Sequence, residues 1–143
     1  TASLTLHVGI GTFQPIRTET ITEHKMQPEQ FYIPEETSKA LIKARKDLKK
    51  IVGVGSTVSR VLESVELNRL KPCGSSGWTD RFIYPGSEFK VVDHLLTNFH
   101  LPKSTLYLLV CAFAGKKLIM EAYNEAILKK YRFFSYGDAM LII

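Results

Sequence analysis

Cysteine is scarce in this sequence, and its scarcity excludes a protein held together by disulfides. The 143 residues contain only two, Cys73 in a Gly/Ser-rich loop and Cys111 inside an apolar run, where a small buried hydrophobe is expected. This favours a reducing cytoplasm over secretion. The cysteines and histidines also lack the spacing of zinc ligands, so we expect no metal. No nucleophile elbow marks a Ser-His-Asp triad.

Long apolar runs are missing too, which argues against a membrane anchor. The longest run, residues 106–114, is far shorter than the roughly 20 residues that span a bilayer. The first residues, TASLTLHVGIG, lack the basic start and the continuous apolar region of a signal peptide. They open within a strand-like pattern and no Met precedes them, so we expect the chain to be a piece of a longer protein.

Acidic residues are outnumbered by basic ones. The chain has 19 Lys and Arg against 14 Asp and Glu, a formal net charge of +5 and a pI near 9.2. This balance favours an anionic partner such as RNA or a phosphate-bearing ligand. It also suits the solubility of a small domain, and composition alone does not separate the two. A hydrophobic content of 45% is enough for a core.

Strand-like and helix-like patterns alternate along the chain and predict an α/β fold, a layered mixed sheet with flanking helices. We predict strands over 4–10, 30–34, 51–54, 81–86, 88–93 and 138–143. We predict helices over 35–50, 56–65, 104–114 and 118–127. Strand 51–54 should be central in the sheet, and helix 104–114 and strand 138–143 should be buried. The Gly- and Ser-rich residues 70–80 should form a loop.

The stretch VGVGST, residues 52–57, is similar to a nucleotide-binding turn. Glycines let the backbone approach a ligand, and the helix that follows offers free N–H groups to an anion. The full dinucleotide and P-loop patterns are absent, however. A tight turn from strand to helix needs the same residues, so both interpretations stay open. Arg60 and Glu63 lie three apart on the following helix, where an exposed ion pair is the simplest expectation.

The stretch TNFHLPKST, residues 97–105, gathers several polar groups just before the apolar helix. His100, or Asp93 just upstream, could act as a general base. Lys103 and the amides at the helix start could bind an anion. We predict that the stretch is a pocket wall fixed by the buried helix behind it, and an ordinary capped loop is the alternative. Further on, YRFFSYGDAM (131–140) packs aromatics around Arg132, which could stack on a base or simply fill the core.

Four longer motifs carry a family resemblance. TLHVGIGTFQPI, EFKVVDHLLTNFHLPKSTL, AFAG and YRFFSYGDAMLI resemble, in this order, the S-adenosylmethionine:tRNA ribosyltransferase-isomerase family of queuosine biosynthesis. The resemblance implies an enzyme that transfers and isomerises the ribosyl group of S-adenosylmethionine onto 7-aminomethyl-7-deazaguanine at the tRNA wobble position. The product is epoxyqueuosine, and adenine and methionine are released. Residues 1–143 would be the C-terminal part of the α/β catalytic domain of a two-domain enzyme, without its N-terminal part and inserted β-barrel.

The same resemblance implies a set of site residues. The catalytic candidates are His100 as the base and Asp93 as second choice. The implied substrate-binding residues are His7, Gly9, Gly11, Thr12, Thr97, Asn98 and Ser104. S-adenosylmethionine would be a co-substrate, with no cofactor or metal, in a cytoplasmic monomer whose partner is tRNA. The chain departs from the family pattern in GSTVSR at 55–60, Cys111 and His94.

Two other functions remain open at this point. The chain could be a non-catalytic RNA-binding or scaffold domain, with the basic helix 35–50 and the aromatic tail as its contact surface. Tight, specific binding of S-adenosylmethionine would exclude that role. A methyltransferase would transfer the methyl group rather than release adenine.

Overall fold

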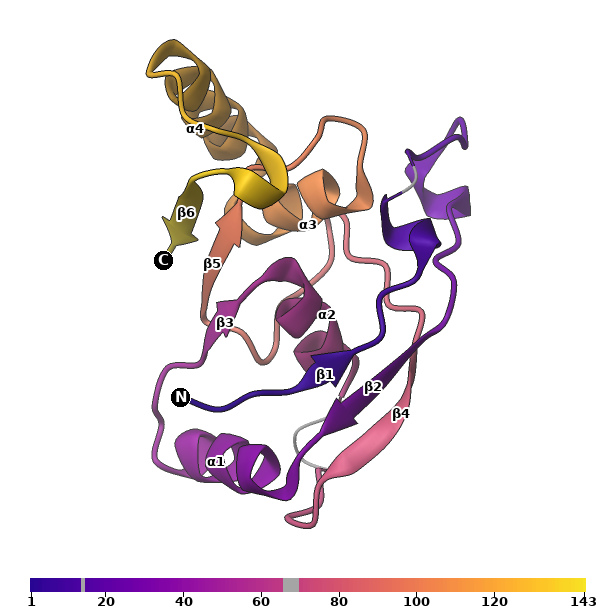
Figure 1. The fold of residues 1–143 in the computed structure, drawn as a ribbon, viewed down its shortest axis with the longest axis vertical. Coiled ribbons are helices and arrows are strands. Elements are labelled where there is room, and N and C mark those ends of the chain that lie inside the picture. The colour runs from indigo at the N-terminus through magenta and orange to yellow at the C-terminus, as the bar shows by residue number, and fades with distance from the viewer. Residues whose placement is uncertain (14, 66–69) are drawn as a thin grey trace.

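The structure is a computed structural model and describes residues 1–13, 15–65 and 70–143. Within these residues, two three-stranded sheets and four α-helices form an α/β fold, which confirms the predicted fold class (Figure 1). Short 3-10 helices connect these elements at Ile10–Phe13, Ile21–Glu23 and Phe134–Tyr136.

The first sheet is antiparallel, in the order β1-β2-β4. It is formed by β1 (Thr5–Leu6), β2 (Glu29–Ile33) and β4 (Ser75–Thr79). The strand predicted over 4–10 is therefore much shorter, because the chain turns into a 3-10 helix at Ile10. The loop predicted over 70–80 is confirmed for 70–74 and for Asp80 but is wrong for 75–79, since these residues pair along the whole length of β2.

The second sheet has the order β3-β5-β6, from β3 (Val52–Val54), β5 (His94–Asn98) and β6 (Ala139–Ile142). β3 is parallel to β5 and β6 is antiparallel to it. Among the described strands β5 is therefore central, and the prediction of a central strand at 51–54 is wrong. Val54 of β3 is 62% exposed. Leu141 of β6 is 61% exposed, so the prediction that the strand at 138–143 is buried is wrong as well.

Residues 81–93 do not form the two predicted strands. The backbone N–H groups of Val91 and Val92 donate to the Glu63 carboxylate on the neighbouring helix instead of to a strand. The predicted turn at Pro85–Gly86 is present, with the Ser87 N–H bonded to the Tyr84 carbonyl. The apolar side chains of this segment are buried without strand pairing, which explains why its pattern resembled that of a strand.

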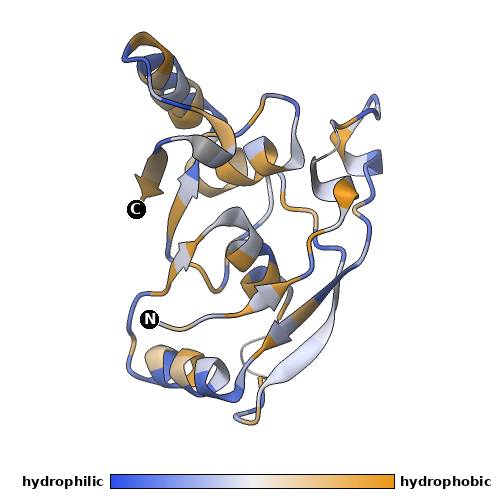
Figure 2. Ribbon diagram, viewed as in Figure 1, coloured by the Kyte–Doolittle hydropathy of each residue, from blue (hydrophilic) through white to orange (hydrophobic). Residues whose placement is uncertain are grey.

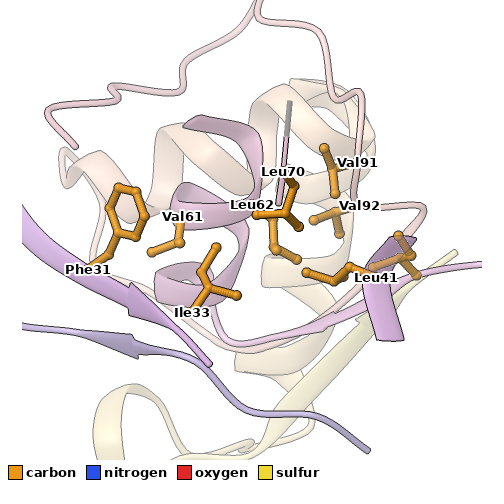
Figure 3. Packing of buried hydrophobic residues seen from close by; sticks show 9 residues of the cluster. Phe31, Ile33, Leu41, Val61, Leu62, Leu70, Val91 and Val92 are labelled. Carbon is orange, nitrogen blue, oxygen red and sulfur yellow. The ribbon is translucent and has the colours of Figure 1, made fainter. Parts of the chain in front are cut away.

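Two helices pack against the first sheet and form one half of the core. α1 (Glu35–Lys46) follows β2, and α2 (Ser56–Ser64) follows β3. α2 lies between the two sheets, and its apolar face meets β2 and α1 (Figures 1 and 3). The core cluster there comprises Phe31, Ile33, Leu41, Ile51, Val61, Leu62, Leu70, Val91 and Val92.

The other two helices form the second half of the core. α3 (Thr105–Ala114) begins after the N-cap Ser104 and ends before Gly115, as predicted, and Figure 2 shows it coloured largely as hydrophobic. Leu109, Val110 and Cys111 are almost fully buried, which confirms the buried helix. α4 (Lys116–Leu128) buries Ile119, Tyr123 and Ala126. The flanking Leu118 and Ile127, predicted on the same stripe, are exposed, so the buried stripe is narrower.

Candidate functional site

A cavity of about 300 Å³ opens where the parallel strands β3 and β5 end. Sites in α/β sheets favour this place, because the loops that follow parallel strands meet at one edge. The volume lies at the lower end of the range for small-molecule sites, roughly 300–1,000 Å³. The lining residues are Val8, Thr12, Gly55, Ser56, Thr57, Arg60, Thr97, Asn98, His100, Leu101, Ser104, Leu106, Phe134 and Ser135.

The turn from β3 to α2 forms one wall of this cavity. The Gly55 N–H donates to the Leu96 carbonyl at 2.8 Å, which extends the pairing with β5 to the end of the strand. Gly55 then has φ +98°, a left-handed conformation that favours glycine. This backbone reversal starts α2 at once, so the first residues of the helix, Ser56 and Thr57, line the cavity. Their N–H groups belong to the first turn of a helix and have no carbonyl partner within it.

His100 stands at the opposite wall and is held at two points. Its Nε2 lies 2.9 Å from the Thr97 hydroxyl. Its backbone N–H donates to the Tyr123 hydroxyl at 2.8 Å. Burial lowers the pKa of His100 to about 4, because desolvation disfavours the imidazolium. The ring is therefore neutral at pH 7 and has a lone pair that can accept a proton.

An aromatic cluster fixes the anchor of His100. The Tyr123 ring packs edge-on against Phe99, with centroids 5.3 Å apart, and against Tyr107 at 5.2 Å. Burial raises the pKa of Tyr123 to about 12, so its hydroxyl stays protonated. Since Tyr123 lies on α4 and Phe99 directly precedes His100, this cluster ties the position of the histidine to the packing of the second core.

A buried ion pair that the sequence did not reveal reaches the wall of the cavity, since Arg60 is one of the lining residues. Arg60 Nη1 donates to Glu29 Oε2 at 2.6 Å, and their side chains are 4% and 2% exposed. Glu29 Oε1 accepts from the Gly9 N–H and from the Thr12 hydroxyl. Arg60 therefore pairs with Glu29 and not with Glu63, and the expectation of an exposed Arg60–Glu63 pair is wrong.

Several of the predicted polar residues already form hydrogen bonds within the protein at the cavity wall. The Thr12 hydroxyl donates to Glu29 and accepts from Arg60 at 3.0 Å, so its proton is already used. The Ser104 hydroxyl caps α3 by accepting from the Tyr107 N–H, and it donates to the Leu101 carbonyl. Asn98 contributes its Nδ2 to the Asp138 carbonyl at 3.4 Å. Thr12 and Ser104 thus shape the cavity more than they offer hydrogen bonds to a ligand.

The structure brings together five of the nine predicted site residues and leaves four outside the cavity lining. Thr12, Thr97, Asn98, His100 and Ser104 line the cavity. His7, Gly9, Gly11 and Asp93 do not. The His7 side chain is exposed, and Gly9 binds Glu29 through its N–H.

Asp93 precedes β5 and so lies at the far end of that strand from Thr97. Its carboxylate accepts from the Ile51 N–H at 2.8 Å and from Lys50 Nζ at 2.9 Å. The backbone hydrogen bond from Ile51 is the main reason for its lowered pKa, followed by the bond from Lys50. This carboxylate holds β3 beside β5, and its position gives no support to a role as general base.

The cavity also contains residues that were not predicted as site residues. Phe134 and Ser135 reach it because the segment before the antiparallel β6 returns to the carboxyl end of β5. Leu101 and Leu106 flank the start of α3. The only sequence signal for Phe134 was its place in an aromatic cluster next to arginine, which also suited a core. Within residues 1–13, 15–65 and 70–143, no group of His, Cys, Asp and Glu has a metal-binding arrangement.

Comparisons with known proteins place the chain among relatives of one kind. The family model described as "Queuosine biosynthesis protein" matches residues 1–142. The S-adenosylmethionine:tRNA ribosyltransferase-isomerase of Natranaerobius thermophilus is 57% identical over 141 residues, which cover 99% of this chain and 41% of the relative. That of Sulfurihydrogenibium sp. is 56% identical, with 99% and 41% covered.

A solved structure agrees with these sequence matches. The crystal structure of an S-adenosylmethionine tRNA ribosyltransferase from Thermotoga maritima superposes with a TM-score of 0.74 at 53% identity. The match covers 80% of this chain and 40% of that one. The chain thus spans about two fifths of the length of these relatives. No helix among the described residues is both long and apolar enough to cross a membrane.

Proposed function

Because the chain belongs to the queuosine biosynthesis protein family, we propose that it forms part of an S-adenosylmethionine:tRNA ribosyltransferase-isomerase active site. The reaction moves the ribosyl group of S-adenosylmethionine onto the amine of 7-aminomethyl-7-deazaguanine in tRNA and isomerises it to epoxyqueuosine. Adenine and methionine leave. The observation that carries this proposal is the cavity at the ends of β3 and β5, which gathers Thr97, Asn98 and His100 of the longest family motif.

We propose His100 as the general base. The chemistry requires a base to take a proton from the carbon beside the sulfonium, whose positive charge makes that carbon acidic. A neutral imidazole has a lone pair for the proton and does not repel the cationic substrate, although burial makes it a weaker base than an exposed imidazole. The Thr97 hydroxyl next to Nε2 fixes the ring orientation. When Nε2 carries the hydrogen and donates it to Thr97, the lone pair on Nδ1 is the proton acceptor.

The remaining groups of the cavity suit the other demands of the reaction. Leaving adenine and a developing oxyanion both need hydrogen-bond donors. The first N–H groups of α2 and the Ser135 hydroxyl stand at the cavity and supply donors there. Because the relatives are more than twice as long as this chain, we propose that further walls of the site come from outside residues 1–143, and that these residues alone are inactive.

The test is adenine release in the intact protein. The protein is incubated with S-adenosylmethionine and tRNA bearing 7-aminomethyl-7-deazaguanine, and free adenine and the ribosylated nucleoside are quantified by mass spectrometry. We expect both products in equal amounts, and none with tRNA that bears guanine. Transfer of the methyl group instead would identify a methyltransferase. Binding of tRNA without any binding of S-adenosylmethionine would identify the RNA-binding or scaffold alternative.

The family resemblance supports three further proposals about the intact protein. It works as a cytoplasmic monomer, takes S-adenosylmethionine as a co-substrate, and needs no resident cofactor or metal. Activity that survives dialysis against a chelator, in a protein whose mass by light scattering matches one chain, would support them.

A further inference from the structure

Phe134 has an unusual place among the aromatic residues of the chain. Phe99, Tyr123 and Phe133 pack together in the second core, with centroids 5.0 to 5.7 Å apart. Phe134 lies outside that group, 6.2 Å from its nearest ring partner Phe133, and is 48% exposed. Phe134 is one of the residues that line the cavity. A half-exposed aromatic side chain in the lining of a cavity is available to contact a ligand.

The backbone around Phe134 is built to hold the ring in this position. Phe134 has φ +66°, in the left-handed region that is rarely adopted by a bulky residue. Such conformations persist only when the surroundings enforce them, and they concentrate at ligand sites. Here the Phe134 N–H is bonded to the Phe99 carbonyl at 3.0 Å, and its own carbonyl accepts from the Gly137 N–H at 2.9 Å.

Two neighbours lock the segment further. Asp138 accepts from the Arg132 N–H and from Arg132 Nη2, at 2.8 and 2.9 Å, and donates its own N–H to the Arg132 carbonyl. This clamp closes the loop around Phe134. Gly137 fits inside the loop only because it has no side chain, since a Cβ there would lie 2.5 Å from the Arg132 carbonyl oxygen.

The rest of the cavity complements a flat ring. Leu101 and Leu106 supply apolar surface, while Asn98, Thr57 and Ser135 supply donors and acceptors. A heterocyclic base has the matching character, with apolar faces and polar edges, and bases are commonly bound by stacking on aromatic side chains.

We propose that Phe134 is the stacking platform for a purine-type base in this cavity. The inference rests on the proposed function, which supplies two such bases, the adenine of S-adenosylmethionine and the 7-deazaguanine of the tRNA. Both present the same flat heterocycle, and the loop of residues 132–138 presents the ring to whichever of them enters. Phe134 would thus be a binding residue that holds a base beside His100.

The experiment compares Phe134→Ala, Phe134→Leu and Phe134→Tyr in the intact protein. Tyr131→Ala is the matched control, because Tyr131 lies in the same segment and is 46% exposed but does not line the cavity. Two ligands are titrated by calorimetry, S-adenosylhomocysteine and tRNA bearing 7-aminomethyl-7-deazaguanine. Removing the ring should weaken one of them about 5- to 150-fold, the usual effect of losing one base–aromatic stack.

The pattern of the variants decides the outcome. Phe134→Tyr should bind like the parent, Phe134→Leu should resemble Phe134→Ala, and Tyr131→Ala should bind normally. A loss confined to S-adenosylhomocysteine identifies adenine as the stacked base, and a loss confined to the tRNA identifies the deazaguanine. Parent-like binding of both ligands by Phe134→Ala, or full rescue by Phe134→Leu, would overturn the proposal. Adenine release by the parent tests the proposed function separately, so either idea can fail while the other stands.

Discussion

Neutralising Glu29 should destabilise the protein far more than any surface charge change. Glu29 is almost fully buried, and its carboxylate accepts from Arg60 at 2.6 Å, from Thr12 at 2.6 Å and from the Gly9 N–H at 2.8 Å. In Glu29→Gln the side chain keeps its shape, but one carboxylate oxygen becomes an NH₂ group, which in either orientation of the amide faces a hydrogen-bond donor, Arg60 on one side or the Gly9 N–H on the other. The guanidinium would also be buried without its counter-ion.

The expected cost follows from this geometry. Removing one partner of a buried ion pair typically costs about 3–5 kcal/mol, because the remaining charge has neither water nor a partner. The free energy of unfolding of Glu29→Gln should fall by that amount, as measured from denaturant titrations with unchanged slope. Substrate binding should weaken too, since Thr12 and Arg60 line the cavity and both are hydrogen-bonded to the Glu29 carboxylate.

The matched control is the exposed pair between Lys43 and Asp47 on α1, with side chains 77% and 41% exposed. Lys43→Gln should cost only about 0.3–0.5 kcal/mol, as exposed pairs one helical turn apart usually do. If Glu29→Gln cost no more than Lys43→Gln, Arg60 would have found water or another partner. The account of a buried ion pair at the cavity wall would then be refuted.

Four further outcomes are expected. His100→Ala should lower turnover, measured as adenine release, about 10²-fold or more, the usual effect of losing a general base. The pKa of His100 is about 4 in the folded state and about 6.5 in the unfolded state, so the protein should lose up to about 3 kcal/mol of stability as the pH falls through this window. In His100→Gln the free energy of unfolding, measured by denaturant titration at several pH values, should depend less on pH. Leu109→Ala should cost about 2–5 kcal/mol as a buried cavity, with adenine release by the folded fraction unchanged. Replacing Lys46 and Lys49 by Gln should weaken tRNA binding regardless of wobble modification. The slope of log K against log salt concentration should become shallower by about 0.7–0.9 per lost phosphate contact, and an unchanged slope would show that these lysines face only solvent.

The helices of this chain could be predicted from residues within or next to each helix. α3 was predictable because Ser104 before the apolar run and Gly115 after it are capping residues, and both act as caps in the structure. α1 was predictable from Pro34 and the two acidic residues that follow it. Helix signals of this kind lie within a few residues of the element they define, so a sequence displays them directly.

The strands depended on distant partners and were harder to predict. β4 consists of Ser, Gly and Thr around Trp78, and nothing local marks it as a strand; it forms because β2 offers it a full ladder of hydrogen bonds. Residues 88–93 show the reverse case. Their apolar pattern is typical of a strand, but the N–H groups of Val91 and Val92 donate to the Glu63 carboxylate instead of to a neighbouring strand. In both cases tertiary contacts override the local preference.

The site was predictable in part for the same reason. The stretch from Thr97 to Ser104 is contiguous, and its place before a buried helix made it a pocket wall by local reasoning. Asp93 was the second choice for the base in the sequence, but β5 separates it from His100 by the length of a strand. Phe134 enters the cavity only because β6 runs antiparallel to β5, a pairing that no local pattern announces.

The pairing of β5 also sets an order in which the protein can be completed during synthesis. β3 is synthesised long before β5, and β6 long after it, so no two of the described strands of this sheet form a hairpin and two long loops must close. Long-range closures of this kind slow folding. Until β6 pairs with β5, the loop closed by Arg132 and Asp138 is not held against β5, and the position of the Phe134 ring is not fixed. The newly made chain can therefore bury much of its core while its ligand cavity is still unfinished.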